Sequence, residues 1–271
     1  MKYALITGGA SGMGRATALK LANNGFTVFS CDINVNTEEK ENIIQIKTDV
    51  TSMDSVQEAY KQVLKVTDKL DAVINFAGII MMNSLIEISE EEFVKIFNIN
   101  LFGAYRVNKT FFPLVKNGNG KIIITTSEVA ENKILPFNAI YGISKKALDA
   151  YAQGLTVELG LLNIPVITLR PGAVKTPIIK SSSEQMNSLN ENTVLYKDTI
   201  SKFKQFVDKE HGKGIEPEKI AKVVLKILNK REPKTVYKKN ISTKLKLLDI
   251  LPVKTQIKVL KLILKQKKNI Q

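Results

Sequence analysis

The sequence predicts an α/β protein built on a doubly wound parallel sheet, as a single domain followed by a basic amphipathic helical extension. Short apolar segments alternate along the chain with longer segments whose apolar residues recur at helical spacing. The strand-like segments are apolar almost throughout, which is typical of parallel strands covered by helices on both faces. Right-handed crossovers between such strands give a doubly wound sheet.

The elements follow in a regular order. Strands are expected over residues 3–9, 26–32, 42–49, 70–78, 120–127, 164–172 and 234–238, and helices over 14–25, 52–69, 89–118, 139–163 and 216–230. The first helix ends at Asn24 and Gly25, and the third opens on a capping box formed by Ser89 and Glu92. Residues 177–214 interrupt the alternation, and an insertion of this length is typical of a lid or binding segment. We therefore expect one α/β domain over 1–239 that includes this insertion as its lid.

The remaining residues, 240–271, form a basic segment. The whole chain has a net charge of +14, but residues 233–271 carry eleven lysines and one acid, Asp249, so about +4 remains for the rest. On a helical wheel from Val253, the lysines 254, 258, 261 and 265 share an arc of roughly 60°. Apolar residues gather on another face, namely Val253, Ile257, Leu260, Ile263 and Leu264.

Three interpretations of this helix stay open. It could pack on its own domain, pair with a second subunit, or lie on an anionic membrane surface. Nucleic acid is not an expected partner, because the helix contains no aromatic residues.

Several classes of protein are disfavoured by composition. A single cysteine, Cys31, and a single histidine, His211, leave no disulfide and no zinc ligand set, so no metal is expected. The start, MKYALITGG, lacks the long apolar stretch of a secretory signal, and no window reaches about 18 apolar residues. We expect a cytoplasmic protein whose membrane contact, if present, is peripheral.

A glycine-rich turn, TGGASGMG at residues 7–14, lies between the first strand and the first helix. Gly8 and Gly12 allow tight turning, Gly14 lets the helix approach the sheet, and the free amides at the helix start suit a pyrophosphate. Asp32 ends the second strand, 18 residues beyond Gly14, and no arginine follows it. A carboxylate there accepts hydrogen bonds from ribose hydroxyls and repels a 2′-phosphate, so NAD is expected rather than NADP.

A tyrosine and a lysine occur four residues apart in YGISK, at residues 141–145. This spacing is close to one helical turn, so Tyr141 and Lys145 are expected on one face of the helix. An ammonium group so placed would favour the phenolate form of the tyrosine.

Taken together, these residues resemble the short-chain dehydrogenase/reductase family over most of 1–232. TGGASGMG looks like its TGxxxGxG turn, NFAG (75–78) like its NNAG segment, YGISK like its YxxxK pair and RPGAVKT (170–176) like its PGxxxT segment. The resemblance implies a Rossmann fold and hydride transfer between NAD(H) and a secondary alcohol or ketone. It also implies a homodimer or homotetramer.

The resemblance assigns roles to individual residues. It implies Tyr141 as proton donor, Lys145 as its partner and ribose ligand, Ser127 as a donor to the substrate oxygen, and Asn100 as part of a water-mediated proton path. Ser127 lies 14 residues before Tyr141, whereas many family members place the serine at 13, which is Glu128 here; a one-residue insertion in EVAENKILPFNA would restore it. Asn100 could instead satisfy backbone groups of a helix kink. The implied cofactor ligands are Thr7, Gly8, Ser11, Gly12, Met13, Gly14, Asp32, Asp49, Val50, Asn75, Ala77, Gly78, Tyr141, Lys145, Pro171, Gly172, Val174 and Thr176.

The expected substrate is hydrophobic. The lid is rich in aliphatic positions, namely Ile178, Ile179, Met186, Leu189, Val194 and Leu195. An LLxxLP tail like that at 247–252 resembles relatives acting on steroids, retinoids or acyl lipids. The alternative is a catalytically silent dinucleotide-binding scaffold or sensor at a membrane surface, although both Tyr141 and Lys145 are retained.

Overall fold

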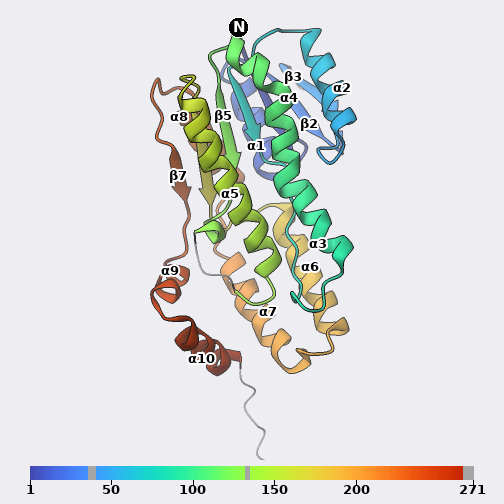
Figure 1. Ribbon diagram of the computed structural model, residues 1–271, viewed down its shortest axis with the longest axis vertical. Coiled ribbons are helices and arrows are strands. Elements are labelled where there is room, and N and C mark those ends of the chain that lie inside the picture. The colour runs from blue at the N-terminus through green and yellow to red at the C-terminus, as the bar shows by residue number, and fades with distance from the viewer. Residues whose placement is uncertain (36–40, 132–134, 265–271) are drawn as a thin grey trace, which may run out of the picture.

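A computed structural model describes residues 1–35, 41–131 and 135–264. In this described part, seven parallel strands form one sheet in the order β3-β2-β1-β4-β5-β6-β7 (Figure 1). The strands are β1 (Lys2–Thr7), β2 (Phe26–Asp32), β3 (Ile43–Lys47), β4 (Ala72–Asn75), β5 (Lys121–Thr125), β6 (Val166–Pro171) and β7 (Val236–Lys239). The predicted fold class is confirmed. The strand order reverses between β1 and β4, which is where such sheets bind ligands.

Helices cover both faces of the sheet. The apolar cluster on one face includes α2 (Met53–Leu64), α4 (Gly103–Asn117) and α5 (Ala139–Gly160). The cluster on the other face includes α1 (Gly12–Ala22) and α8 (Pro217–Leu228). The remaining described helices are α3 (Glu90–Phe97), the π-helical η1 (Asn98–Phe102), the short η2 (Glu128–Ala130), α6 (Pro177–Asn192), α7 (Lys197–His211), α9 (Thr243–Ile250) and α10 (Val253–Leu264).

Two predicted helices differ from the observed ones. The helix expected over 89–118 begins with the predicted cap, because Ser89 Oγ accepts from Glu92 N at 3.2 Å, but η1 interrupts it. A π-helical turn of this kind is common at functional sites. The helix expected over 52–69 ends at Leu64, because the Thr67 hydroxyl bonds to both backbone groups of Lys69 and forms a local turn instead.

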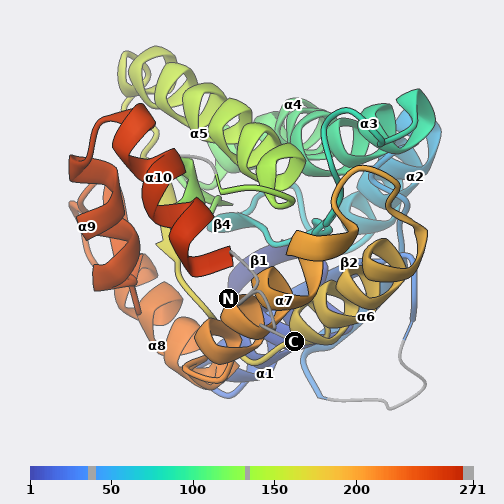
Figure 2. The same cartoon turned by 90° about the horizontal axis from the view of Figure 1, so that it is seen from below.

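The lid and tail lie at the end of the molecule toward which the strands point. Figure 2, seen from below, shows α6 and α7 across this end with α10 beside α7. The predicted apolar face of α10 does not turn inward as a whole: Ile257 is 47% exposed and Leu264 is buried, while the polar Gln256 is also buried. Gln256 faces inward because its Nε2 donates to the Leu248 and Leu251 carbonyls near the end of α9, at 2.6 and 3.2 Å. Lys265, which completes the predicted basic arc, lies outside the described residues.

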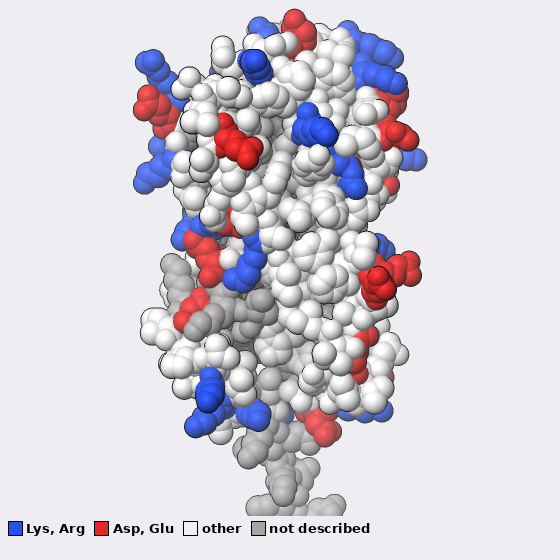
Figure 3. Space-filling view, in the orientation of Figure 1, with Lys and Arg blue, Asp and Glu red and all other residues white. Residues whose placement is uncertain are grey.

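The face of the molecule in Figure 3 carries both signs of charge, separated by broad uncharged surface. Within the ranges described above, no helix combines the length and apolar composition needed to cross a membrane.

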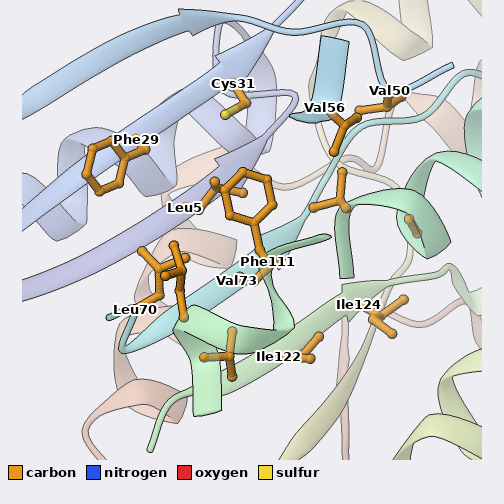
Figure 4. Packing of buried hydrophobic residues seen from close by; sticks show 14 of the residues in the cluster. Leu5, Phe29, Cys31, Val50, Val56, Leu70, Val73, Phe111, Ile122 and Ile124 are labelled. Carbon is orange, nitrogen blue, oxygen red and sulfur yellow. The ribbon is translucent and has the colours of Figure 1, made fainter. Parts of the chain in front are cut away.

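The core has two layers because strand side chains alternate between the faces of the sheet. Leu5 of β1 packs in the cluster with α2, α4 and α5, together with Phe29, Val73 and Phe111 (Figure 4). Its neighbour Ile6 packs on the opposite face with α1 and α8. The rigid sheet between these layers holds the strand ends in fixed register, and these ends position the functional residues.

Candidate active site

A cavity of about 250 Å³ lies where β1, β2 and β4 end. The glycine turn forms one side of it, and Asp32, Asp49 and Val50 lie around it. Of the residues expected to hold the cofactor, this cavity is lined by Gly8, Ser11, Gly12, Met13, Gly14, Asp32, Asp49, Val50, Ala77, Gly78 and Thr176. The structure therefore brings most of the predicted ligands of the adenosine half together.

The glycine turn fits the phosphates of a dinucleotide. Gly8 and Gly12 have φ values of +69° and +50°, which favour glycine, and a Cβ added at Gly14 would lie 2.0 Å from the Gly8 carbonyl oxygen. The first turn of α1 carries no acidic residue, and Ser11 makes no side-chain cap bond there. The amides and the positive end of the helix dipole thus favour an anion at this place.

Asp32 lines the same cavity and also shapes the turn. One carboxylate oxygen accepts from Ala10 N at 3.0 Å, and the other accepts from Asn34 N at 3.0 Å. Each carboxylate oxygen has a second lone pair, so the group can still accept a hydrogen bond from a ligand.

A second cavity, of about 340 Å³, contains the tyrosine and lysine of YGISK. Tyr141, Lys145 and Ser127 line it together with Pro171, Gly172, Val174 and Thr176. Both cavities are lined by Met13, Phe76, Gly78, Ile79, Thr176 and Ile178, so they adjoin. A molecule held by the glycine turn can therefore reach Tyr141.

Tyr141 and Lys145 are stacked on one face of α5, as predicted. The Lys145 Nζ lies 5.9 Å from the centre of the Tyr141 ring and donates to the Thr125 carbonyl at 3.1 Å. Lys145 is buried, and this desolvation lowers its pKa to about 8.

Lys145 was expected to lower the pKa of the Tyr141 phenol, but burial of the phenol is the dominant influence on that pKa. Burial raises the pKa of Tyr141 to about 12; the side-chain hydrogen bond with Ser127 opposes this shift, and the charge of Glu128 adds to it. These surroundings favour the protonated phenol over the phenolate.

Ser127 reaches the site in spite of its unusual spacing. It lines the cavity beside Tyr141, and its Oγ accepts from Val129 N at 3.4 Å. The structure thus places Ser127, and not only Glu128, at the phenol. Part of the segment that holds the extra residue, 132–134, lies outside the described residues.

Asn100 is fully buried and does not line either cavity. Its Oδ1 accepts from Ile79 N at 2.8 Å, and its Nδ2 donates to the Ile79 carbonyl at 3.0 Å and to Ser144 Oγ at 3.0 Å. A Cβ at Gly78 would lie 3.1 Å from Asn100 Oδ1 and 3.5 Å from Lys145 Nζ. The side chain therefore fixes the segment after β4 beside Lys145.

Two further predicted ligands lie away from the cavities. Asn75 Nδ2 donates to Asn108 Oδ1 at 2.8 Å, which turns this side chain into the interior. Thr7 Oγ1 accepts from Ala77 N at 3.3 Å. Asn75 Nδ2 also donates to the Ile123 carbonyl of β5 at 3.3 Å, so both side chains link the ends of neighbouring strands and loops.

Comparisons with known proteins identify the family. The sequence model of the short chain dehydrogenases matches residues 2–187. The chain belongs to this family. It is therefore an NAD(P)-dependent oxidoreductase that acts on CH–OH and C=O groups.

Individual relatives are moderately similar. The 3-ketodihydrosphingosine reductase of Bacteroides thetaiotaomicron is 28% identical over 84% of both chains. The NADPH-dependent 1-acyldihydroxyacetone phosphate reductase of Schizosaccharomyces pombe is 33% identical, covering 72% of this chain and 68% of that one. A short-chain dehydrogenase/reductase of Burkholderia phymatum, solved with NAD, superposes with a TM-score of 0.74 at 23% identity, covering 87% of this chain and 88% of that one.

This member of the family also has cavity residues that the sequence motifs did not reveal. They include Glu128, Leu135, Phe203 and the stretch 240–243. Glu128 lies 13 residues before Tyr141, at the position where many family members have the serine. This spacing was the only sequence signal that placed Glu128 near the site. The others come from segments whose place in the fold is decided by long-range packing.

A buried ion network lies directly behind the site. Arg170 donates to both oxygens of Asp149, at 2.8 and 2.7 Å, and also pairs with Glu131. Thr126 donates to Asp149 at 3.1 Å, and Lys238 pairs with Glu131 at 2.6 Å. Since Thr126 precedes Ser127 and Arg170 precedes Pro171, the network joins two edges of the reaction cavity.

Proposed function

We propose that this enzyme transfers a hydride between NAD(H) and a secondary alcohol or ketone, with Tyr141 as proton donor to the substrate oxygen. The observation that carries the proposal is the convergence of Tyr141, Lys145 and Ser127 on one cavity that adjoins the glycine turn. The nicotinamide supplies the hydride. The protein supplies the proton and orients the oxygen.

Each side chain has a distinct proposed role. Because the pKa of Tyr141 is raised, the phenol holds the proton that carbonyl reduction requires. Ser127 donates a hydrogen bond to the same substrate oxygen. Lys145, whose pKa is lowered to about 8, can return a proton to the phenol near neutral pH. Asn100 is a positioning residue, because it holds the backbone of Ile79 beside Lys145.

We propose NAD as the preferred cofactor. The Asp32 carboxylate lies on the cavity where β2 ends, and its charge would repel a 2′-phosphate. The proposed ligands of the nicotinamide half are Tyr141, Lys145, Pro171, Gly172, Val174 and Thr176, which all line the reaction cavity.

We propose a hydrophobic substrate under a lid formed by α6 and α7. Apolar side chains from the lid and its surroundings line the cavity, among them Ile80, Met82, Ile178, Ile179 and Phe203. Two relatives carry the names of reductases for 3-ketodihydrosphingosine and 1-acyldihydroxyacetone phosphate, which are ketones with long apolar chains. This agreement supports a lipid-like ketone or alcohol.

The direct test begins with cofactor binding. NADH is titrated with the protein, and binding is followed by NADH fluorescence. Turnover is then measured as NADH oxidation with a panel of ketones and as NAD reduction with the matching alcohols. We expect saturable binding and turnover of the apolar members. Saturable binding with no turnover of any member would favour the silent scaffold instead.

A second proposal concerns the membrane. The α9–α10 surface exposes Leu247, Ile250, Val253, Leu262 and Ile263 beside the exposed lysines Lys254, Lys258 and Lys261. This combination suits the interface of an anionic bilayer. We expect the protein to co-sediment with liposomes rich in phosphatidylserine and to lose this property when truncated after Lys239. Unchanged sedimentation of the truncated chain would end the proposal.

A further inference from the structure

The chain that follows β7 lines the reaction cavity before it enters α9. Asn240, Ile241, Ser242 and Thr243 all contribute to the cavity lining. This part of the chain lies beyond residue 187, where the family match ends. The C-terminal segment, defined here as residues 240–264, therefore adds a surface to the cavity that the family motifs do not describe.

The first residues of the segment are attached to the loop after β6. Gly172 N donates to the Lys239 carbonyl at 2.8 Å, and Asn240 Nδ2 donates to the Ala173 carbonyl at 2.9 Å. A Cβ at Gly172 would lie only 2.0 Å from the Asn240 carbonyl oxygen, so this approach requires glycine. The segment thus starts in contact with a loop that borders the proposed nicotinamide site.

A second attachment reaches the catalytic loop itself. Ser242 N donates to Glu128 Oε2 at 2.6 Å. Glu128 follows Ser127 directly, and its charge acts on the Tyr141 phenol. Hydrogen bonds to a carboxylate are stronger than neutral ones. One carboxylate therefore contacts the C-terminal segment and faces the catalytic tyrosine.

The far end of the segment contacts the lid. Leu264 of α10 is buried in an apolar cluster with Ile200 and Phe203 of α7, and Tyr141 packs against the same cluster. Between the two ends, Leu247 and Leu262 are 65% and 73% exposed. The segment is thus anchored near both ends, and apolar side chains run from the tyrosine to α10.

We propose that the start of this segment, residues 240–243, forms one side of the substrate site, and that Glu128 is the positioning residue that latches the segment beside Tyr141. The inference rests on the proposed function, since it assigns one side of the same cavity. An apolar chain on the reacting carbon would run along the cavity from Tyr141 past Leu135 and Phe203, the cavity-lining members of this cluster. The substrate class is therefore a ketone or alcohol with an extended apolar chain rather than a compact one.

The latch is tested by hydrogen exchange of the full-length protein. Ser242→Pro removes the amide hydrogen, whereas the control Ser242→Ala loses the same hydroxyl but keeps that hydrogen. We expect amides of α9 and α10 to exchange about tenfold faster in the proline variant than in the alanine variant. Equal rates would overturn the latch.

A second pair of variants removes the acceptor instead. Glu128→Ala loses it, while Glu128→Gln keeps an oxygen at the same position and should restore most of the protection. These variants decide the question if the proline variant does not fold. Equal exchange in the alanine and glutamine variants would contradict the role of Glu128.

The substrate contact is tested by binding rather than turnover. With NAD bound, 2-decanone should slow exchange over 240–264 in the unaltered protein, whereas 2-butanone should not. If 2-decanone leaves this exchange unchanged, the segment is not part of the substrate site. NADH oxidation with the same ketones is measured in parallel, so that a failure of the proposed reaction is distinguished from a failure of this inference.

Discussion

Removal of the Asp149 carboxylate is predicted to destabilise the protein strongly. Asp149 is 5% exposed and accepts four hydrogen bonds, two from Arg170, one from Thr126 and one from Gln153. Asp149→Ala takes the acceptor from all four donors. The Arg170 guanidinium, itself 7% exposed, then loses its bidentate partner.

The loss of unfolding free energy depends on whether each donor finds another hydrogen-bond acceptor. Leaving a buried donor unsatisfied costs roughly 1–3 kcal/mol. Gln153 is exposed and can bond to water, and Glu131 still pairs with Arg170, so the loss is smaller than four full penalties. Breaking a buried ion pair by removing one partner typically costs about 3–5 kcal/mol, which we adopt for Asp149→Ala.

Thermal unfolding of the cofactor-free protein, followed by circular dichroism, measures this loss as a fall in Tm of about 10 °C. The control is Glu216→Ala, because Lys175 and Glu216 are paired at 2.6 Å but are 55% and 56% exposed. An exposed pair contributes only about 0–1 kcal/mol. Equal falls in Tm for the two variants would refute the reasoning.

The same prediction has a pH dependence. Burial raises the pKa of Asp149, but the hydrogen bonds from Arg170, Gln153 and Thr126 and the charge of Arg170 together outweigh burial and hold this pKa below its usual value. The stabilisation is therefore present above the unfolded pKa and is lost as pH falls through the folded pKa. The difference in Tm between the unaltered protein and Asp149→Ala should shrink in acid. A difference that grows there would contradict this assignment.

Three other predictions concern the site. Gly14→Ala should weaken NADH binding, measured by fluorescence, by ~10-fold or more, because the added Cβ would lie 2.0 Å from the Gly8 carbonyl oxygen. The control is Gly154→Ala, which has open space around the added Cβ and should bind NADH normally. Asp32→Ala should raise the affinity for NADPH relative to NADH about tenfold or more, and an unchanged ratio would argue against repulsion of a 2′-phosphate. Burial lowers the pKa of Lys145 from 10.5 to about 8. Below pH 8 the buried lysine is charged, and this charge destabilises the cofactor-free fold. The destabilisation disappears as the pH rises from 8 towards 10.5. Lys145→Met should therefore raise Tm most near pH 7, and a gain that grows towards pH 10 would contradict this sign.

Local patterns were sufficient to predict the fold. Successive strand residues such as Leu5 and Ile6 point to opposite faces of the sheet and are both apolar. This pattern indicates that helices cover both faces, and it does not depend on the conformation of the loops. Gly8, Gly12 and Gly14 were equally informative, because the backbone conformation and close approaches they allow exclude most other residues.

Features that depend on long-range contacts were not predictable. The helical wheel of α10 placed its apolar residues on one face but could not show which side chains are buried; Gln256 is buried because it bonds to carbonyls near the end of α9. The pKa of Tyr141 depends on how deeply α5 is covered, which spacing to Lys145 does not reveal. Glu128 reaches Ser242, a residue 114 positions away, and no sequence signal indicates that contact.

The central claim is that the Tyr141 hydroxyl delivers a proton to the substrate oxygen, while most of the proposed cofactor contacts lie at other residues. It is tested by comparing Tyr141→Phe with the unaltered protein in NADH binding and in the rate of NADH oxidation with a reducible ketone. Since Tyr141 is only one of the proposed cofactor ligands, the variant should still bind NADH within a few fold of the unaltered affinity but lose turnover by a factor of about 10²–10⁴. Turnover within a few fold of the unaltered rate would contradict the account.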